Sequence, residues 1–115
     1  MSRKIRKRIT AKPKAKARVF AALGDKTRLA LLARLCSGEP SSISQLAEDS
    51  KLTRQAITKH LGVLERAGIV SSIQSGRERL FRFESEPLDD LQQYLASVSK
   101  QWNQTRDRRK SRTER

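Results

Sequence analysis

The amino-acid sequence predicts a mainly helical chain in which four helices are followed by one small β-hairpin and a fifth helix. Two observations lead to this prediction. Apolar residues recur every three or four positions along most of the chain, which is the spacing of one face of an α-helix. Between residues 69 and 83 this spacing gives way to short apolar runs on either side of Ser75 and Gly76, a pair typical of turns. The predicted order is therefore α-α-α-α-β-β-α.

The first two helices are predicted before residue 37. The residues that begin the apolar periodicity are Val19, Phe20 and Leu23. Gly24 ends this short helix, and Asp25 can cap the next one. Apolar residues then recur at a spacing of three, at Leu29, Leu32 and Leu35. Cys36 ends this leucine-rich helix, and we expect it to be a small buried side chain rather than a reactive thiol.

A short third helix and a longer fourth helix form a pair. Ser42 and Gln45 fit a capping box at the start of the third helix, which ends near Asp49. A turn that includes Lys51 leads into the fourth helix, which lies in the stretch from Leu52 to Gly68. Two helices joined by a turn of three or four residues, the second of them basic, are typical of a helix-turn-helix motif.

The fourth helix carries one apolar face. Thr53 is its expected N-cap, and Leu52 and Ile57 have the spacing of a hydrophobic staple. The apolar residues that should seat the helix in the core are Ile57, Leu61 and Leu64. Gly68 is the expected stop.

The other face of this helix is suited to DNA. It begins with four residues of which none is acidic: Arg54, Gln55, Thr58 and Lys59. In the major groove, Arg or Lys pairs best with guanine and Gln with adenine. We therefore predict a recognition helix. We expect His60, beside them, to orient the helix or touch a phosphate, because it has no companion ligand for a metal.

A β-hairpin after Gly68 is expected to act as a wing. Arg77 and Arg79 follow its tip, and Glu78 is the only acid between residues 69 and 83. We expect both arginines, with Lys51 in the preceding turn, to neutralise phosphates. The alternative is ordinary exposed charge on a hairpin.

The last helix carries an apolar stripe of two heptads. Ser85, Glu86 and Pro87 open it, and its stripe residues are spaced 3, 4, 3, 4: Leu88, Leu91, Leu95, Val98 and Trp102. Such a stripe is too short for a free coiled coil and needs another surface. We expect a twofold dimer built from the stripe and the helix of Val19, Phe20 and Leu23. Packing within one monomer is the competing explanation.

The chain is predicted to be one domain with basic ends. Residues 1–16 form a basic disordered arm, residues 17–104 the folded domain, and residues 105–115 a basic disordered tail. Residues 1–18 carry nine Lys or Arg and no acid, whereas residues 19–105 hold eleven bases and ten acids. The ends therefore create most of the formal net charge of +14. The arm suits a narrow minor groove, although a weak non-specific charge contribution is the more common role of such a segment.

Composition also indicates the compartment. One cysteine excludes a disulfide within the chain and suits a reducing environment. No apolar run approaches the ~18 residues of a membrane span, and the basic N-terminus lacks the apolar centre of a secretory signal. We expect a cytoplasmic protein.

Three strings of sequence resemble the ArsR/SmtB family of winged helix-turn-helix bacterial repressors. They are ALGDKTRLALLARL (22–35), TRQAITKHLGVLERAGIV (53–70) and GRERLFRF (76–83), and the resemblance covers roughly residues 18–102. It implies a homodimer that binds a palindromic operator on the bacterial nucleoid and represses transcription.

The resemblance also directs attention to metal sites, because many members of the family sense metals. One family site uses a Cys-x-Cys pair, and the matching positions here are Ser42 and Ser44. The other uses carboxylates and histidines on the last helix, and the matching positions are Ser85, Pro87, Val98 and Gln101. These residue types do not make a plausible zinc site. We expect no metal, no cofactor and no metal sensing of the known types, and we cannot name a small-molecule effector.

The sequence therefore favours a sequence-specific DNA-binding regulator that acts as a repressor or autorepressor. The main alternative is a nucleoid or RNA-associated protein that binds nucleic acid non-specifically through its basic ends. An enzyme is disfavoured because the sole histidine lies in the recognition helix, with no nucleophile near it in the motif.

Overall fold

The computed structural model describes residues 13–48 and 50–113, and the side chains among them up to residue 110. Its helices and strands follow in the order α2 (Pro13–Leu23), α3 (Lys26–Cys36), β1 (Ser41–Ser42), α4 (Ile43–Glu48), α5 (Arg54–Arg66), β2 (Val70–Ser75), β3 (Glu78–Phe83) and α6 (Glu86–Thr113). The mainly helical fold and its hairpin are confirmed. Within these residues no helix combines the length and apolar content needed to span a membrane.

The start of each central helix is set by local chemistry that the sequence predicted. Asp25 caps α3, since its carboxylate accepts from the backbone N–H of Arg28. The capping box at α4 is complete. The Ser42 N–H donates to the Gln45 side chain at 2.8 Å, and the Gln45 N–H donates to the Ser42 hydroxyl at 3.2 Å.

The sheet has one strand more than the predicted hairpin. Strands β2 and β3 pair from Val70 with Phe83 to Ser75 with Glu78. Strand β1 pairs with the outer edge of β3, Ser41 opposite Phe81 and Ser42 opposite Leu80, so the order is β1-β3-β2. Two serines carry no apolar alternation, which is why periodicity did not indicate this strand.

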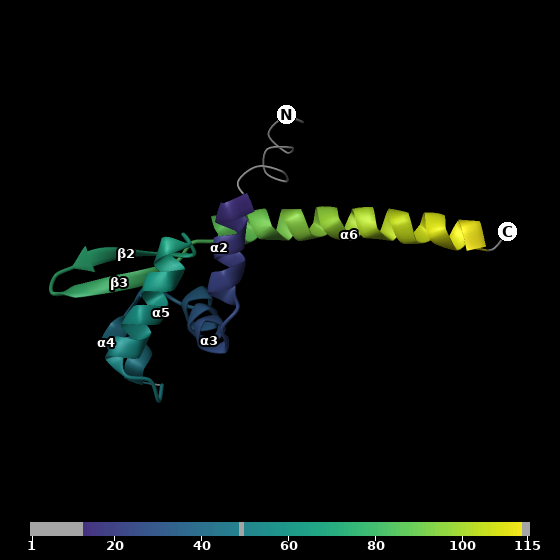
Figure 1. Cartoon of the computed structure of the whole chain (residues 1–115). Coiled ribbons are helices and arrows are strands. Elements are labelled where there is room, and N and C mark those ends of the chain that lie inside the picture. The colour runs from purple at the N-terminus through teal and green to yellow at the C-terminus, as the bar shows by residue number, and fades with distance from the viewer. Residues whose placement is uncertain (1–12, 49, 114–115) are drawn as a thin grey trace.

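The core lies between α3, α5 and the sheet. Its most completely buried large side chains are Leu46, Ile57, Leu61, Leu64, Ile69 and Val70. Helix α2 and the first turns of α6 pack on this body, and the rest of α6 projects away from it (Figure 1). The body therefore presents α5 and the hairpin from a rigid base.

The structure departs from the sequence analysis at two positions of α3. Leu29 is half exposed, whereas Leu31, Leu32 and Leu35 form the buried side. Cys36 is exposed rather than buried, although the atoms that do cover it raise the pKa of its thiol through desolvation. Both differences arise because the buried face of this helix is centred between Leu31 and Leu35, and Leu29 and Cys36 lie at its margin.

The predicted ends of the folded domain were also too short. Helix α2 already begins at Pro13, a residue pre-organised for the first helical position, so the expected arm of residues 1–16 overlaps it. The remainder of that arm lies outside the described residues. Helix α6 continues to Thr113 where we expected a disordered tail. After Pro87 the sequence has no Gly or Pro, and Arg, Lys and Gln favour helix without an apolar face.

Candidate nucleic-acid interface

Helix α5 is seated by its apolar face. Ile57, Leu61 and Leu64 are buried at relative exposures of 1% or less. Thr53 caps the helix, because its hydroxyl accepts from the Ala56 N–H at 3.1 Å. Gly68 follows the end of the helix with a φ of 78°, a left-handed conformation that glycine adopts without strain. The predicted limits of the helix are confirmed.

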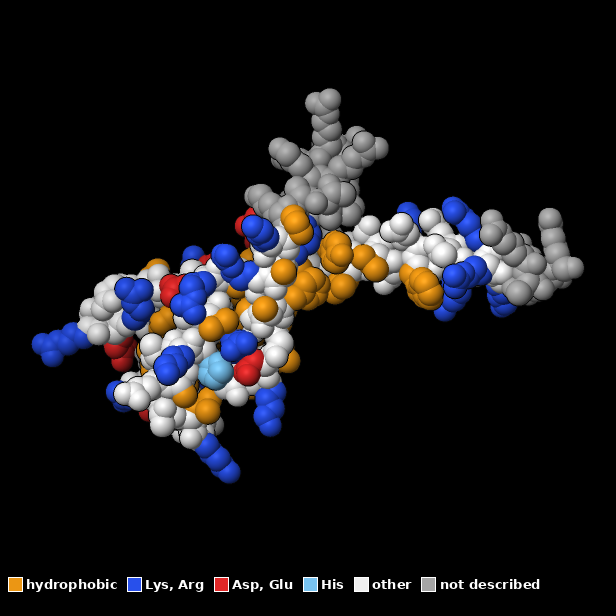
Figure 2. Space-filling view, viewed as in Figure 1, with side chains coloured by type: hydrophobic (Ala, Val, Ile, Leu, Met, Phe, Trp, Pro, Cys, Tyr) orange, Lys and Arg blue, Asp and Glu red, His pale blue; other side chains and the backbone are white. Residues whose placement is uncertain are grey.

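The opposite side of α5 is exposed and free of acid at its start. The side chains that we predicted for the groove all lie at the surface: Arg54, Gln55, Thr58 and Lys59. The first turn contains no acidic residue, so its unpaired backbone N–H groups and the helix dipole favour an approaching phosphate. Lysine and arginine side chains are spread over the face that carries α5 and the hairpin (Figure 2).

The two threonines of this surface are partly engaged by the helix itself. Thr58 donates its hydroxyl hydrogen to the Arg54 carbonyl at 2.7 Å, so it retains an acceptor and a methyl group for a ligand. Thr53 uses an oxygen lone pair for the cap and keeps its hydrogen. The donors aimed outward are therefore chiefly those of Arg54, Gln55 and Lys59, whereas the Thr58 methyl suits a thymine methyl.

The hairpin places its two predicted arginines differently. Gly76 turns the chain at the tip with a φ of 62°, and Arg77 beside it is exposed. Arg79 lies further back, where its Nη1 donates to the Ser72 hydroxyl at 2.8 Å. Ser72 in turn donates to the Glu65 carboxylate at 2.8 Å. Arg77 thus reaches outward, and Arg79 braces the hairpin against the last turns of α5.

A second polar group stiffens the base of the hairpin. Glu84 accepts from the Ser71 hydroxyl at 2.7 Å and from the Arg82 Nε at 3.1 Å. These two donors lower the pKa of the Glu84 carboxyl, since both favour its charged form. These contacts join the two strands of the hairpin at its base, on the side where the chain leaves for α6.

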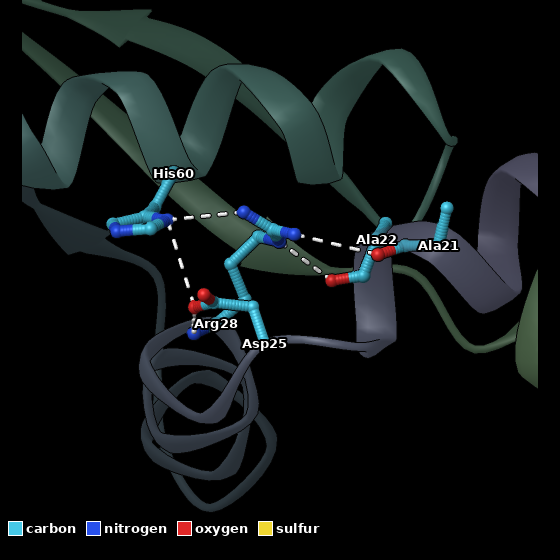
Figure 3. A network of polar contacts seen from close by, with 5 residues as sticks. All are labelled: Ala21, Ala22, Asp25, Arg28 and His60. Atoms are coloured by element: carbon cyan, nitrogen blue, oxygen red, sulfur yellow. Dashed lines mark hydrogen bonds and ion pairs between the residues drawn. The ribbon is translucent and has the colours of Figure 1, made fainter.

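His60 lies on α5 beside Asp25 and Arg28 at the start of α3, and its side chain is partly exposed. Its Nδ1 lies 3.3 Å from Nη1 of Arg28 and 3.9 Å from the Asp25 carboxylate (Figure 3). The backbone N–H of Arg28 and, to a smaller extent, the charge of its guanidinium lower the pKa of the Asp25 carboxyl. These contacts are those that the orienting role of His60 requires, and its contact with a phosphate stays a prediction.

The predicted dimer residues divide into two groups. Within the monomer, Val19 and Leu91 are buried, and Leu23 and Leu88 pack on the core. The other four have relative exposures between 38% and 55%: Phe20, Leu95, Val98 and Trp102. Hydrophobic side chains gather where α6 leaves the body (Figure 2). Packing within one monomer therefore accounts for the first group and leaves the second uncovered.

Two arginines of α3 were not assigned a role by the sequence. Arg28 donates to the last carbonyls of α2, and Arg34 donates to the carbonyls of Gln45 and Leu46 in α4. These contacts join neighbouring helices through side chains and backbone carbonyls, so the apolar periodicity within each helix contains no signal for them.

The described residues offer little for a metal or cofactor. They contain no group of three or more His, Cys, Asp or Glu side chains that could hold an ion. A hollow of about 360 Å³ lies between α3 and the turn before α5, and its polar lining includes Lys26, Thr27 and Ser50. Leu31 and Leu52 supply its apolar part.

Comparison with known proteins places this geometry in context. A family model described as a helix-turn-helix domain matches residues 23–73. The HTH-type transcriptional regulator YuzN of Bacillus subtilis is 42% identical over 79 residues, which cover 64% of this chain and 86% of that protein.

Solved structures share the fold over most of the chain. An ArsR-like transcriptional regulator from Rhodococcus sp. RHA1 has a TM-score of 0.77 at 35% identity, covering 85% of this chain and 92% of the other. The homodimeric winged helix-turn-helix domain of Mb0332 from Mycobacterium bovis has a TM-score of 0.61 at 23% identity, covering 76% and 80%.

Proposed function

Since the chain belongs to the ArsR family of winged helix-turn-helix transcriptional regulators, we propose that it binds a palindromic operator as a homodimer and represses transcription from it. The observation that carries this proposal is the division of α5 into two sides. Its apolar side is fully buried, and its exposed side begins with Arg54, Gln55 and Lys59, with no acid in the first turn. A rigidly seated cationic helix of this kind is the part that reads base edges.

The hairpin and the turn supply affinity rather than sequence information. Arg77 at the tip and Lys51 before α5 are exposed and reach phosphates on either side of the groove. Each such contact releases a condensed counterion, so binding weakens as salt rises. Arg79 contributes mainly by holding the hairpin through Ser72 and Glu65.

The dimer is proposed from the uncovered apolar side chains of α2 and α6. Phe20 lies edge-on to Tyr94 with ring centres 6.4 Å apart, and Leu95, Val98 and Trp102 continue the same stripe outward. The Trp102 side chain is 55% exposed, and leaving the largest apolar side chain of the sequence in water is unfavourable in free energy. A second copy of the chain offers the same stripe in return. The homologous domain of Mb0332 is itself homodimeric.

The charges along α6 favour an antiparallel pairing of the two copies. Its first turn carries Glu86 and Asp89, followed by Asp90, whereas Lys and Arg predominate from Lys100 onward. Parallel helices would set acid beside acid and base beside base. An antiparallel pair brings each basic end near the acidic start of the other helix, and it also opposes the two helix dipoles.

A twofold dimer explains why an operator would be palindromic. One α5 contacts too few base pairs to specify a site in a genome. Two copies set roughly 34 Å apart read successive turns of the same face of the duplex. Occupation of such a site on the nucleoid, in the cytoplasm, would block the start of transcription. No metal is required by this mechanism.

The groove assignment is tested with two single variants. Arg54→Ala should relax base preference at one position of each half-site and cost on the order of 1–3 kcal/mol. Arg77→Ala should weaken binding to all sequences alike and reduce the salt slope by about one unit. Selection from randomised duplexes, followed by titration at several salt concentrations, measures both.

A matched control is Lys14→Ala, which removes an exposed cation from α2, away from the proposed groove surface. It should leave base preference unchanged. If Arg54→Ala and Arg77→Ala both weaken every sequence equally, α5 does not read the groove in the proposed orientation.

One observation favours a second candidate function, non-specific binding of nucleic acid. The basic end of α6 is helical and exposes Arg106, Arg108, Arg109 and Lys110 far from α5. A protein that relied on this end would bind operator and random duplexes with similar affinity. It would also lose most of its affinity when the four residues are replaced by Gln.

A further inference from the structure

Arg28 on α3 contacts two other helices at once. Its Nε donates to the Ala22 carbonyl at 2.7 Å, and its Nη2 donates to the Ala21 carbonyl at 3.3 Å. These carbonyls belong to the last turn of α2. Its Nη1 lies 3.3 Å from Nδ1 of His60, in the middle of α5 (Figure 3). One guanidinium therefore ties the end of α2 to the recognition helix.

The contact with His60 is a hydrogen bond in only one tautomer of the imidazole. A guanidinium has five N–H donors and no acceptor, so the contact requires Nδ1 of His60 as the acceptor, with the proton on Nε2. The Asp25 carboxylate is 3.9 Å from the same Nδ1, which is too long for a hydrogen bond. Arg28, rather than Asp25, is therefore the partner of His60.

Asp25 holds the other end of this contact. Its Oδ2 accepts from the backbone N–H of Arg28 at 3.0 Å and so fixes that residue in the first turn of α3. The backbone of Arg28 is therefore fixed by Asp25, while its guanidinium contacts α2 and α5. None of these contacts involves a residue that we place in the DNA groove.

We propose that Arg28 is a positioning residue that sets the angle between α2 and α5, and through it the spacing of half-sites that the dimer accepts. This rests on the proposed function, in which α2 lies at the dimer interface and α5 in the groove. Arg28 bridges directly between the element that fixes the twofold axis and the element that reads DNA.

The dimensions of the helix show why this angle matters. Thirteen residues of α5 span roughly 20 Å at 1.5 Å per residue. A tilt of about 10° about one end moves the other end by roughly 3.4 Å, which equals one base-pair step. Two such helices are related by the dimer axis, so small changes of angle alter which spacing fits both half-sites.

Arg34 provides the matched control for this role. It also lies on α3 and donates through Nη1 and Nη2 to carbonyls at the end of a neighbouring helix, those of Leu46 at 2.7 Å and Gln45 at 3.2 Å. That helix is α4. Arg34→Lys should therefore lose a similar pair of bonds without loosening the α2–α5 junction.

The experiment compares four variants of the full chain: Arg28→Lys, His60→Phe, His60→Asn and Arg34→Lys. Lysine keeps the charge of Arg28 but cannot bond two helices in a planar fork. Phenylalanine keeps a ring without an acceptor, whereas asparagine returns an acceptor close to the place of Nδ1. The probes are the duplex selected by the wild-type protein, duplexes with its half-sites moved apart or together by one or two base pairs, and a single half-site.

The wild-type protein should prefer its own spacing by about tenfold or more over a shift of two base pairs, within the range of coupling between sites. In Arg28→Lys this preference should fall to less than about threefold, with half-site affinity unchanged, and His60→Phe should reduce the preference to a similar extent. His60→Asn should restore most of the preference, and Arg34→Lys should keep it.

A preserved spacing preference in both Arg28→Lys and His60→Phe would overturn the inference. Equal losses on the half-site and on the palindrome would also overturn it, because they indicate a general weakening of α5. A wild-type protein with no preference for the palindrome would instead refute the proposed function. ¹⁵N NMR of the sole histidine tests the contact without DNA. It should show an unprotonated Nδ1 whose signal moves in Arg28→Lys, and a protonated Nδ1 would contradict the contact.

Discussion

Helices α5 and α6 both carry an apolar face, but only the face of α5 is fully buried within one chain. The three inward side chains of α5 are buried within the chain itself, at exposures of 1% or less. The stripe of α6 begins the same way, with Leu91 at 4%, but Leu95 is 49% exposed one turn later and Trp102 is 55% exposed. The difference teaches that one chain alone covers the apolar side of α5, whereas it leaves the outer apolar side chains of α6 exposed, which is why we propose a second copy as their cover.

The charges of the two helices differ in the same sense. The exposed side of α5 is cationic at its start, where the helix dipole is positive as well, so it repels other cations and suits a polyanion. Helix α6 is acidic at its start and basic at its end, so its charges can be matched by a reversed copy of itself. The charges of α5 are therefore suited to a nucleic acid, and those of α6 to a second copy of α6.

The largest expected effect is a difference in unfolding free energy between a core substitution in α5 and a stripe substitution in α6. Leu64→Ala should lower the free energy of unfolding by about 2–5 kcal/mol, because it opens a cavity in a fully buried site of α5. Leu95→Ala should change it by less than about 0.5 kcal/mol at protein concentrations where the chain is monomeric. Urea unfolding of both variants measures the contrast, and similar losses would mean that α6 is also covered within one chain.

The next effect concerns assembly. The double variant Leu95→Glu with Trp102→Glu should give monomers in light scattering and lower operator affinity by about 100-fold, since the second half-site no longer adds to the first. Leu29→Glu is the matched control, because Leu29 is equally exposed on α3 but lies outside the stripe. An unchanged dimer mass in the double variant would show that the stripe is not the interface.

The smallest expected effect is a loss of unfolding free energy at low pH, caused by the Asp25 carboxyl at the start of α3. The backbone N–H of Arg28 and the neighbouring charges hold the pKa of Asp25 below its usual value of 3.8. A carboxyl with a lowered pKa stabilises the fold above its unfolded value, and this contribution is lost as the pH falls through the folded value. Stability should therefore decline below about pH 4.

Asp25→Asn isolates this charge, because asparagine caps a helix about as well as aspartate. The variant should show a shallower decline in unfolding free energy between pH 5 and pH 3. Glu84→Gln should act in the same direction through the hairpin, since Ser71 and Arg82 lower the pKa of Glu84. A variant with the same pH profile as the wild-type protein would show that the Asp25 charge does not stabilise the fold.

Much of the part that contains α3, α4, α5 and the hairpin could be predicted because its sequence signals are local. The caps at Asp25, Ser42 and Thr53 and the stop at Gly68 are each defined within a few residues. The hairpin followed from a turn signal between apolar runs. These features depend on backbone chemistry that does not change with the rest of the fold.

The features that the sequence did not predict are of two kinds. Some arise from contacts between separate elements, and others lie where the sequence has no apolar pattern. Strand β1 forms because β3 lies beside it. Arg28 contacts His60 at a separation of 32 residues in the sequence, and Arg34 contacts carbonyls of the following helix. The outer part of α6 has no apolar periodicity after Trp102, so its helix went unpredicted although its residues favour one. The contact of His60 with Arg28 likewise depends on the position of α3, which the sequence pattern does not give.

The most direct test of a sequence-specific dimeric regulator is one competition measurement. The wild-type protein is bound at physiological salt to the palindromic duplex that it selects from a random pool, and a random duplex of the same length competes. The account predicts that the selected duplex binds at least about 10³ times more tightly. A ratio near one would contradict it and would leave the protein as a non-specific binder of nucleic acid.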